Sequence, residues 1–285
     1  MPRTNPPSRP ACHPAATRRL IRTVDRIVAN GSVPRPARLA ALTRALRTAL
    51  NRPGCSDPEL ASTALALAPL VQELHSPLEA QFLAERALQL FEERWNAQPR
   101  NAVRANNVAV AILTLGDLAR ESGALDVAEQ SCRRAERIVA TFRTGAPLDC
   151  LRTKALYHER LGQLAQLRQH HGIARRRFAQ ALRLARQLVR RDHSDTDYRR
   201  GLSVCHMRLA LLALDLRHFP TARRHLTRVI ALRRHLLRQE PANPLWHDNL
   251  ARAEATRTHL RIESRRAKQR SLTFPSPSRG DNEPF

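Results

Sequence analysis

The stretch LGQLAQLRQHHGIA, residues 161–174, decides the fold because its pattern of small residues occurs three more times along the chain. In each copy a small residue is followed, twelve positions later, by an alanine. The first members of the four pairs are Ala68, Gly116, Gly162 and Ala210, and the second members are Ala80, Ala128, Ala174 and Ala222. Successive copies therefore lie 48, 46 and 48 residues apart. A fixed period in this range predicts an array of stacked helical hairpins.

Each repeat indicates two antiparallel helices. In the second repeat, apolar residues at helical spacing predict helices over residues 102–120 and 125–142. Gly123 lies between them and can adopt the left-handed conformation that ends a helix. The paired small residues then fit the place where the two helices of a hairpin cross, because a large side chain there would hold the backbones apart.

Start signals mark several of the expected helices. Asp57-Pro58 and Asn243-Pro244 each place a capping side chain before a proline at the first helical position. Ser76-Pro77-Leu78-Glu79 predicts a capping box, in which serine and glutamate bond each other's backbone amides. Pro69 predicts a kink or break in the first helix of its repeat, because proline removes a backbone donor.

At these positions the chain resembles the tetratricopeptide repeat family. The family's pattern is a Leu-Gly pair, an alanine twelve residues after the glycine, an aromatic residue four later and another alanine three after that. The third repeat matches it at Leu161, Gly162, Ala174, Phe178 and Ala181. The long period is similar to that of a long-helix bacterial variety, with Tyr198 and Trp246 at corresponding positions 48 residues apart.

The resemblance implies an all-α, tetratricopeptide-like α-solenoid of about four to five antiparallel helix pairs with a C-terminal capping helix. It covers residues 57–267, with the capping helix over residues 245–266. Residues 17–56 are interpreted as a degenerate leading helix pair. Residues 1–16 and 268–285 are rich in proline or serine without periodicity, and we expect them to be disordered tails.

Charge is distributed unevenly along the chain. The formal net charge is +24, and 47 of the 49 basic residues are arginine. Residues 151–285 carry +18, whereas residues 51–150 carry −3. This asymmetry predicts an acidic partner, either a protein or a nucleic acid. For the preference of arginine over lysine, the nucleotide composition of the genome is an alternative interpretation that the sequence alone does not separate from selection. The family resemblance favours a non-enzymatic protein-binding scaffold, with a nucleic-acid-binding solenoid as the alternative. A scarcity of aromatic side chains to stack bases weakens that alternative.

Ligands of such arrays usually lie against the first helices of the repeats, which line the concave groove. By repeat register the predicted groove residues are Asp117, Arg120, Glu159, Arg160, Gln163, Gln166, Met207, Arg208 and Leu211. Arg160 and Arg208 are 48 residues apart, so they are expected to stack and could hold a carboxylate or phosphate together. In the alternative interpretation each arginine pairs with a neighbouring acid such as Glu159.

A second arginine set falls opposite the apolar stripes of the second helices. Its members are Arg176, Arg183, Arg186, Arg190, Arg224 and Arg228. Such a charged outer face is usually only solvated, and the less favoured interpretation is a basic surface that docks acidic protein or phosphate backbone.

No cofactor or metal is predicted. The five cysteines form no Cys-x-x-Cys pair, which argues against a zinc site or disulfide framework and favours a reducing, cytoplasmic location. His158 and His206 occupy the same position in adjacent repeats, where a packing role is favoured over metal binding. No apolar run is long enough to cross a membrane.

Overall fold

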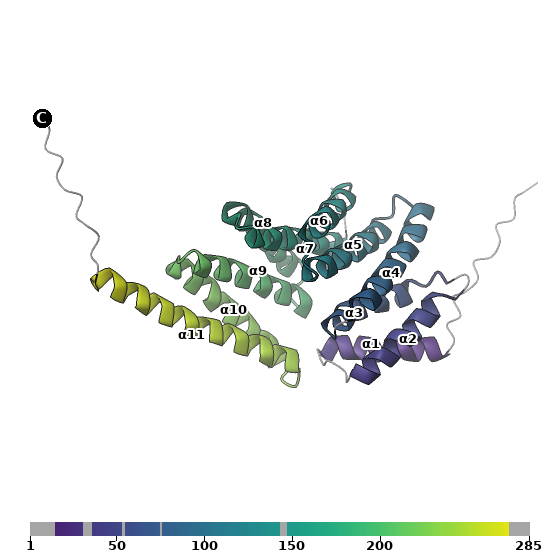
Figure 1. The fold of residues 1–285 in the computed structure, drawn as a ribbon, viewed down its shortest axis with the longest axis horizontal. Coiled ribbons are helices and arrows are strands. Elements are labelled where there is room, and N and C mark those ends of the chain that lie inside the picture. The colour runs from purple at the N-terminus through teal and green to yellow at the C-terminus, as the bar shows by residue number, and fades with distance from the viewer. Residues whose placement is uncertain (1–14, 31–35, 53–54, 75, 143–146, 274–285) are drawn as a thin grey trace, which may run out of the picture. The chain divides into compact units, whose positions relative to one another are not determined.

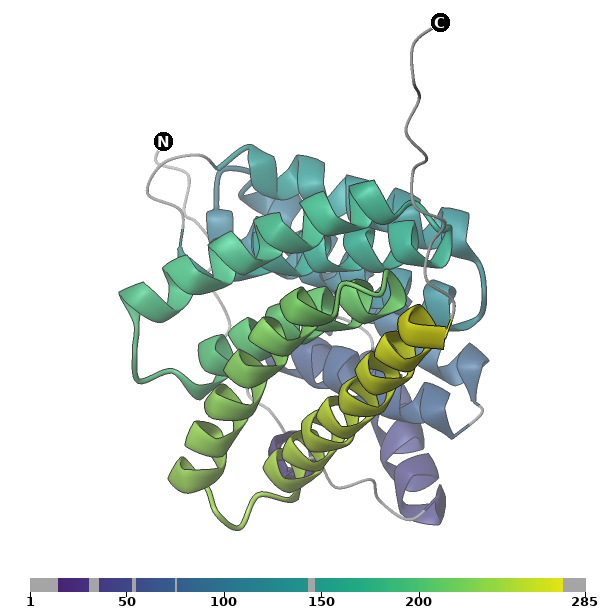
Figure 2. The same ribbon diagram turned by 90° about the vertical axis from the view of Figure 1, so that its left-hand side faces the viewer.

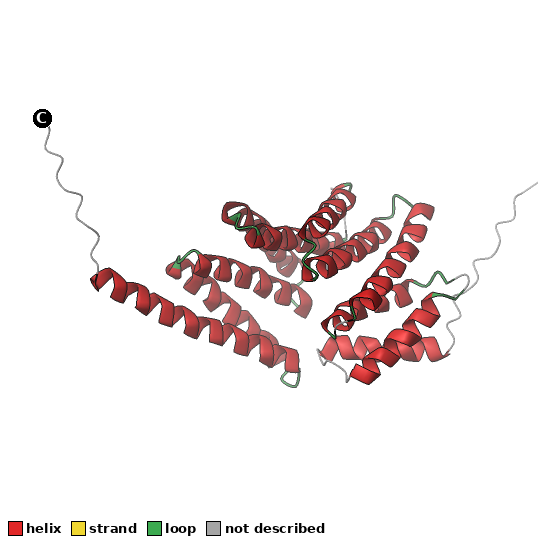
Figure 3. Ribbon diagram, in the orientation of Figure 1, coloured by secondary structure: helices red, strands yellow, loops and turns green. Residues whose placement is uncertain are grey.

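A computed structural model of the protein describes residues 15–30, 36–52, 55–74, 76–142 and 147–273. These residues form helices joined by turns, with no strand among them (Figure 3). In chain order the helices are α1 (Ala15–Asn30), α2 (Pro36–Leu50), α3 (Pro58–Glu73), α4 (Pro77–Ala97), α5 (Ala102–Glu121), α6 (Leu125–Ala140), α7 (Leu148–Leu167), α8 (His171–Arg191), α9 (Thr196–Asp215), α10 (Phe219–Gln239) and α11 (Pro244–Thr273) (Figure 1). The predicted leading pair over residues 17–56 corresponds to α1 and α2.

The chain divides into two compact units, Met1–Gln169 and His170–Phe285. The N-terminal unit contains α1–α7, and its hairpins α3–α4 and α5–α6 pack helix against helix. Leu67, Leu83 and Leu90 are fully buried in its core. Gly116 of α5 shows why a small residue is needed at the hairpin crossing, because a Cβ there would lie 2.9 Å from Ser131 Cβ of α6.

The C-terminal unit contains α8–α11, with α9 and α10 as its hairpin. Ala210 and Ala222, the repeat pair of this hairpin, are buried in one cluster with Leu226 and with Leu260 of α11. Figure 2 shows α10 and α11 joined by a short turn and running side by side, in agreement with their packing contacts. Trp246 of α11 is 6% exposed, so this side chain of the capping helix is buried in the unit.

The turns that close the hairpins repeat with the same period. Gly123 ends its helix with a φ of +83°, as predicted. Gln169 follows Gly123 by 46 residues and Arg217 follows Gln169 by 48, and the two adopt φ values of 62° and 57°. Both therefore hold a left-handed conformation that costs a side-chain-bearing residue about 1–2 kcal/mol.

Two of the predicted helix signals behave as expected. Glu59 donates its backbone N–H to the Asp57 carboxylate at 2.9 Å, and Leu245 donates to Asn243 Oδ1 at 3.0 Å. Each of these side chains therefore caps the helix that follows it.

Of the kink or break expected at Pro69, the break is wrong, because α3 continues through this residue. Leu67, Ala68 and Val71 around it are buried, and this packing holds the helical backbone despite the lost hydrogen bond. The capping box at Ser76 is also absent. Ser76 makes no side-chain capping bond, and Glu79 instead accepts a hydrogen bond from Arg47 of α2 at 2.6 Å.

The helix ends differ from their predicted positions in two places. Helix α6 ends at Ala140 rather than at residue 142. Helix α11 continues to Thr273, so the predicted tail over residues 268–285 begins inside a helix. Most of the predicted N-terminal tail, residues 1–14, and residues 274–285 of the C-terminal one lie outside the described residues.

Candidate binding surfaces

Four of the predicted groove residues form one polar network between α5 and α7. Arg160 donates from Nε and Nη2 to Asp117 Oδ2, at 3.0 and 2.7 Å. Its Nη1 donates to Glu159 Oε2 at 3.0 Å, and Gln163 donates to the other oxygen of Glu159. Glu159 is only 4% exposed, so its charge is stabilised by this network rather than by water.

The network fixes the charge state of Arg160. Burial disfavours the guanidinium, but the carboxylates of Asp117 and Glu159 outweigh burial and raise the pKa of Arg160 above its ordinary value. The structure brings Asp117, Glu159, Arg160 and Gln163 together, and their role in binding stays a prediction. Arg160 follows the alternative interpretation, pairing with Glu159, and it also pairs with Asp117, which the sequence did not indicate.

Arg120 lies at the edge of the same face and is less completely paired. Its Nη2 lies 3.0 Å from Glu121 Oε1, while its Nε is 4.0 Å from Asp117 Oδ1, beyond hydrogen-bonding distance. The Nε is buried and has no hydrogen-bond partner among the described residues. Gln166 follows one turn after Gln163 on α7 and is half-buried.

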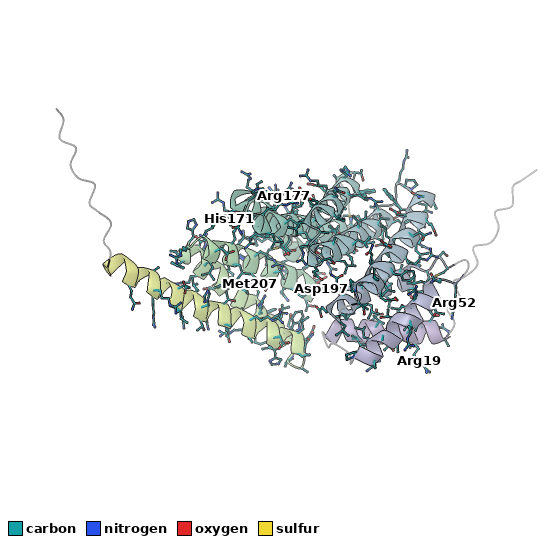
Figure 4. All side chains as sticks on the ribbon, in the orientation of Figure 1. Arg19, Arg52, His171, Arg177, Asp197 and Met207 are labelled. Atoms are coloured by element: carbon teal, nitrogen blue, oxygen red, sulfur yellow. The ribbon has the colours of Figure 1, made fainter. Side chains whose placement is uncertain are left out.

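The remaining predicted groove residues, Met207, Arg208 and Leu211, lie on α9 in the C-terminal unit. Met207, labelled in Figure 4, packs against apolar clusters that include Ile230 of α10 and Ala253 of α11. It therefore contributes to packing with the capping helix. The expected stacking of Arg160 on Arg208 joins residues of different units and stays a prediction.

The second predicted arginine set is on the surface. Arg176, Arg183, Arg186 and Arg190 of α8 and Arg224 and Arg228 of α10 are all exposed. Figure 4 shows that α8 also carries His171 and Arg177.

Sequence reasoning missed a pocket of ≈ 580 Å³ in the C-terminal unit. Its lining residues are Arg186 of α8, Arg199, Leu202 and His206 of α9, and Arg228, Ala231, Leu232, His235 and Arg238 of α10. Only Arg186 and Arg228 belonged to the predicted basic face. The recurrence of basic residues at positions 228, 235 and 238, which share one side of a helix, could have indicated the rest.

Two histidines of this unit, His206 of α9 and His225 of α10, form a close pair. His206 Nδ1 lies 2.9 Å from Nδ1 of His225, and His206 is 5% exposed. Burial and the charges of His225, Arg186 and Arg228 lower the pKa of His206 to about 4. No group of three or more histidine, cysteine or acidic side chains that could hold a metal ion occurs among the described residues. In the same part of the chain, no helix is both long and apolar enough to cross a membrane.

Comparison with solved structures identifies the fold. BtubC (BKLC) from P. vanneervenii aligns over 95% of this chain and 99% of its own, with a TM-score of 0.50 and 17% identity. The fold is tetratricopeptide-like. TTC0263, a thermophilic TPR protein of Thermus thermophilus, aligns over 84% of this chain and 98% of its own, with a TM-score of 0.42 and 20% identity.

The predicted all-α, tetratricopeptide-like solenoid class is therefore confirmed. No protein-family model matches the sequence, and no curated protein matches it.

Proposed function

We propose that the protein is a non-enzymatic scaffold that binds an acidic segment of a partner protein. The proposed contact surface in the N-terminal unit is the α5–α7 face, defined by Asp117, Arg120, Arg160 and Gln163. The observation that carries this proposal is the network that holds Asp117, Arg160 and Gln163 in place beside Arg120. A surface whose polar groups are fixed before binding loses less conformational entropy when a partner docks.

Arg120 is the proposed anchor for a partner carboxylate. Arg160 already donates to Asp117 and Glu159 through all three of its guanidinium nitrogens, so it positions the face rather than gripping the partner. The side chain of Arg120 is 25% exposed, and among the described residues its guanidinium hydrogen-bonds only the more exposed Glu121, so it keeps donors for a partner carboxylate. A charge-assisted bond of this kind contributes about 1.5–3 kcal/mol. The net charge of +24 favours encounter with acidic partners in general.

The test is affinity capture with the full chain, with and without nuclease, followed by mass spectrometry. We expect protein partners that survive nuclease, that carry acidic segments and that are lost with Arg120→Ala. The matched control is Arg133→Ala on α6, which is 64% exposed and pairs only with Glu129 of its own helix among the described residues.

Two results would contradict the proposal. Partners that depend on intact nucleic acid would move the nucleic-acid-binding solenoid to first place. Partners that are lost equally with Arg120→Ala and Arg133→Ala would show that overall charge, and not the α5–α7 face, determines binding.

A further inference from the structure

The pocket between α8, α9 and α10 concentrates positive charge without an acid to balance it. Four arginines line it, Arg186, Arg199, Arg228 and Arg238, together with His206 and His235. Within the described part of the chain, no carboxylate pairs with any of these four guanidinium groups. Arg199 donates to the neutral side chain of Gln239, at 3.3 Å. Like charges gathered in this way repel one another, and this repulsion destabilises the folded protein when no anion occupies the pocket.

Helical periodicity explains how these residues come together. Positions 228, 231, 232, 235 and 238 share one side of α10, and positions 199, 202 and 206 share one side of α9. Arg186 reaches the same space from α8. The cluster is therefore built by three helices packed on one another, rather than by one charged stripe facing solvent.

The same arginines disfavour the charged forms of the two histidines that line the pocket. Burial and the neighbouring Arg199 and Arg238 lower the pKa of His235, and burial with His225, Arg186 and Arg228 lowers that of His206. In addition, Nε2 of His235 is buried and has no hydrogen-bond partner among the described residues. A buried ring nitrogen without a partner is unfavourable unless a ligand or water satisfies it.

We propose that this pocket binds the phosphate chain of a small phosphorylated molecule. Guanidinium groups recognise phosphate oxygens in pairs, and several arginines can neutralise a chain that carries more than two negative charges. The volume of ≈ 580 Å³ suits a small ligand. Leu202, Ala231 and Leu232 supply an apolar wall for an organic portion. Apart from histidine, no lining side chain is aromatic, which disfavours single-stranded nucleic acid that stacks its bases.

This site does not depend on the proposed scaffold function, and its test uses purified protein without a partner. Isothermal titration of the full chain with inorganic tripolyphosphate measures affinity for a bare phosphate chain. A parallel titration with a nucleoside triphosphate shows whether an organic portion adds affinity through the apolar wall. We expect both to bind, and each complex to raise the melting temperature, because a ligand of the folded state stabilises it.

Two double variants with the same loss of charge separate a built pocket from a diffuse basic surface. Arg186→Gln with Arg228→Gln removes two lining residues, whereas Arg183→Gln with Arg223→Gln removes two exposed arginines of the same helices outside the pocket. We expect the pocket variant to weaken tripolyphosphate binding about tenfold or more, and the control about twofold or less. The pocket variant without ligand should also melt at a higher temperature than the control, because it relieves repulsion.

Protonation supplies a readout that a general charge effect would not give. Sulfate keeps its charge over the pH range of this test, so its binding reports the protein's own ionisation. In the free protein, burial and the charges of His225, Arg186 and Arg228 lower the pKa of His206 to about 4, and the pKa of His235 is lowered too. A bound anion favours the charged forms of both rings, and sulfate affinity should therefore rise as pH falls from about 6.5 towards about 4. In the variant His235→Gln this rise should be smaller. Equal weakening by the two double variants, or no measurable tripolyphosphate binding, would overturn the proposal.

Discussion

Arg160 on α7 and Asp117 on α5 are joined by two hydrogen bonds, of 3.0 and 2.7 Å, to the same carboxylate oxygen. Each side chain is 23% exposed, so the pair is partly shielded from water. We expect Asp117→Asn to cost about 2 kcal/mol of unfolding free energy, because it leaves a half-buried guanidinium with one carboxylate fewer. Urea denaturation measures this loss.

The matched control for this pair is Asp126→Asn. Asp126 also bonds an arginine, Arg168, but its side chain is 90% exposed. Exposed ion pairs contribute at most about 1 kcal/mol, so Asp126→Asn should lower the free energy of unfolding by no more than this. Equal losses in the two variants would mean that shielding does not strengthen the Asp117–Arg160 pair.

A second prediction compares the same substitution at two helical glycines. Gly116→Ala places a Cβ 2.9 Å from Ser131 Cβ, where backbone must shift, and overpacking of this kind costs about 1–3 kcal/mol. Gly201→Ala meets nothing within 4 Å and should stabilise α9 by about 0.5–1 kcal/mol, because alanine loses less entropy in a helix. Thermal melts of the two variants should therefore shift in opposite directions. Stabilisation by Gly116→Ala would disprove the close crossing.

Much of this hairpin geometry could be predicted because it depends on local signals. The recurrence of Gly116 and Ala128 at fixed spacing is visible in the sequence, and the glycine of the turn at position 123 is visible too. Gln169 and Arg217 could not be predicted, because nothing in their side chains favours the left-handed conformation that the repeat imposes on them.

The polar contacts were predicted less completely. Register indicated that Asp117, Glu159 and Arg160 share a face, but it could not decide between mutual pairing and exposure to a ligand. That choice depends on side-chain conformations, which the sequence pattern does not specify. The continuity of α3 through Pro69 likewise depends on packing with residues far away in the sequence.

A third prediction concerns the two strained turns. Gln169→Gly and Arg217→Gly should each raise the unfolding free energy by up to about 1 kcal/mol, because glycine adopts positive φ without a steric penalty. Gly123→Ala, at φ +83°, should lower it by a similar amount. Differential scanning calorimetry of the three variants measures the expected gain of stability in the two glycine variants and the expected loss in Gly123→Ala. A loss of stability in both glycine variants would show that the original side chains contribute more than the strain costs.

A fourth prediction concerns thiol reactivity. Burial raises the pKa of Cys132 to about 12 and also raises the pKa of Cys150, so both stay protonated near neutral pH and react slowly. Cys55 is only half-buried. Limited alkylation of the folded protein, followed by peptide mass spectrometry, should label Cys55 well before Cys132 and Cys150. Equal alkylation rates for Cys55 and Cys132 in the native protein would contradict the burial of the Cys132 side chain on α6.

The last prediction concerns acid. His206 has a pKa of about 4 in the folded protein, against 6.5 for the free side chain, so the unfolded chain binds a proton more readily. Stability that is fully present above pH 6.5 should therefore fall as pH drops from about 6.5 to about 4. The hydrogen bond between His206 and His225 requires one ring nitrogen to accept, and protonating both rings removes it. The full shift corresponds to a loss of at most about 3 kcal/mol, to which other titrating groups add their own changes.

Urea denaturation at several pH values measures this dependence, and His206→Gln should make it shallower. His247→Gln provides the control, because His247 is exposed and lies on α11, away from the pair. The control should keep the wild-type slope. If His206→Gln also keeps that slope, the buried histidine pair does not contribute to the acid sensitivity of the C-terminal unit, and other groups must bind the protons that accompany unfolding.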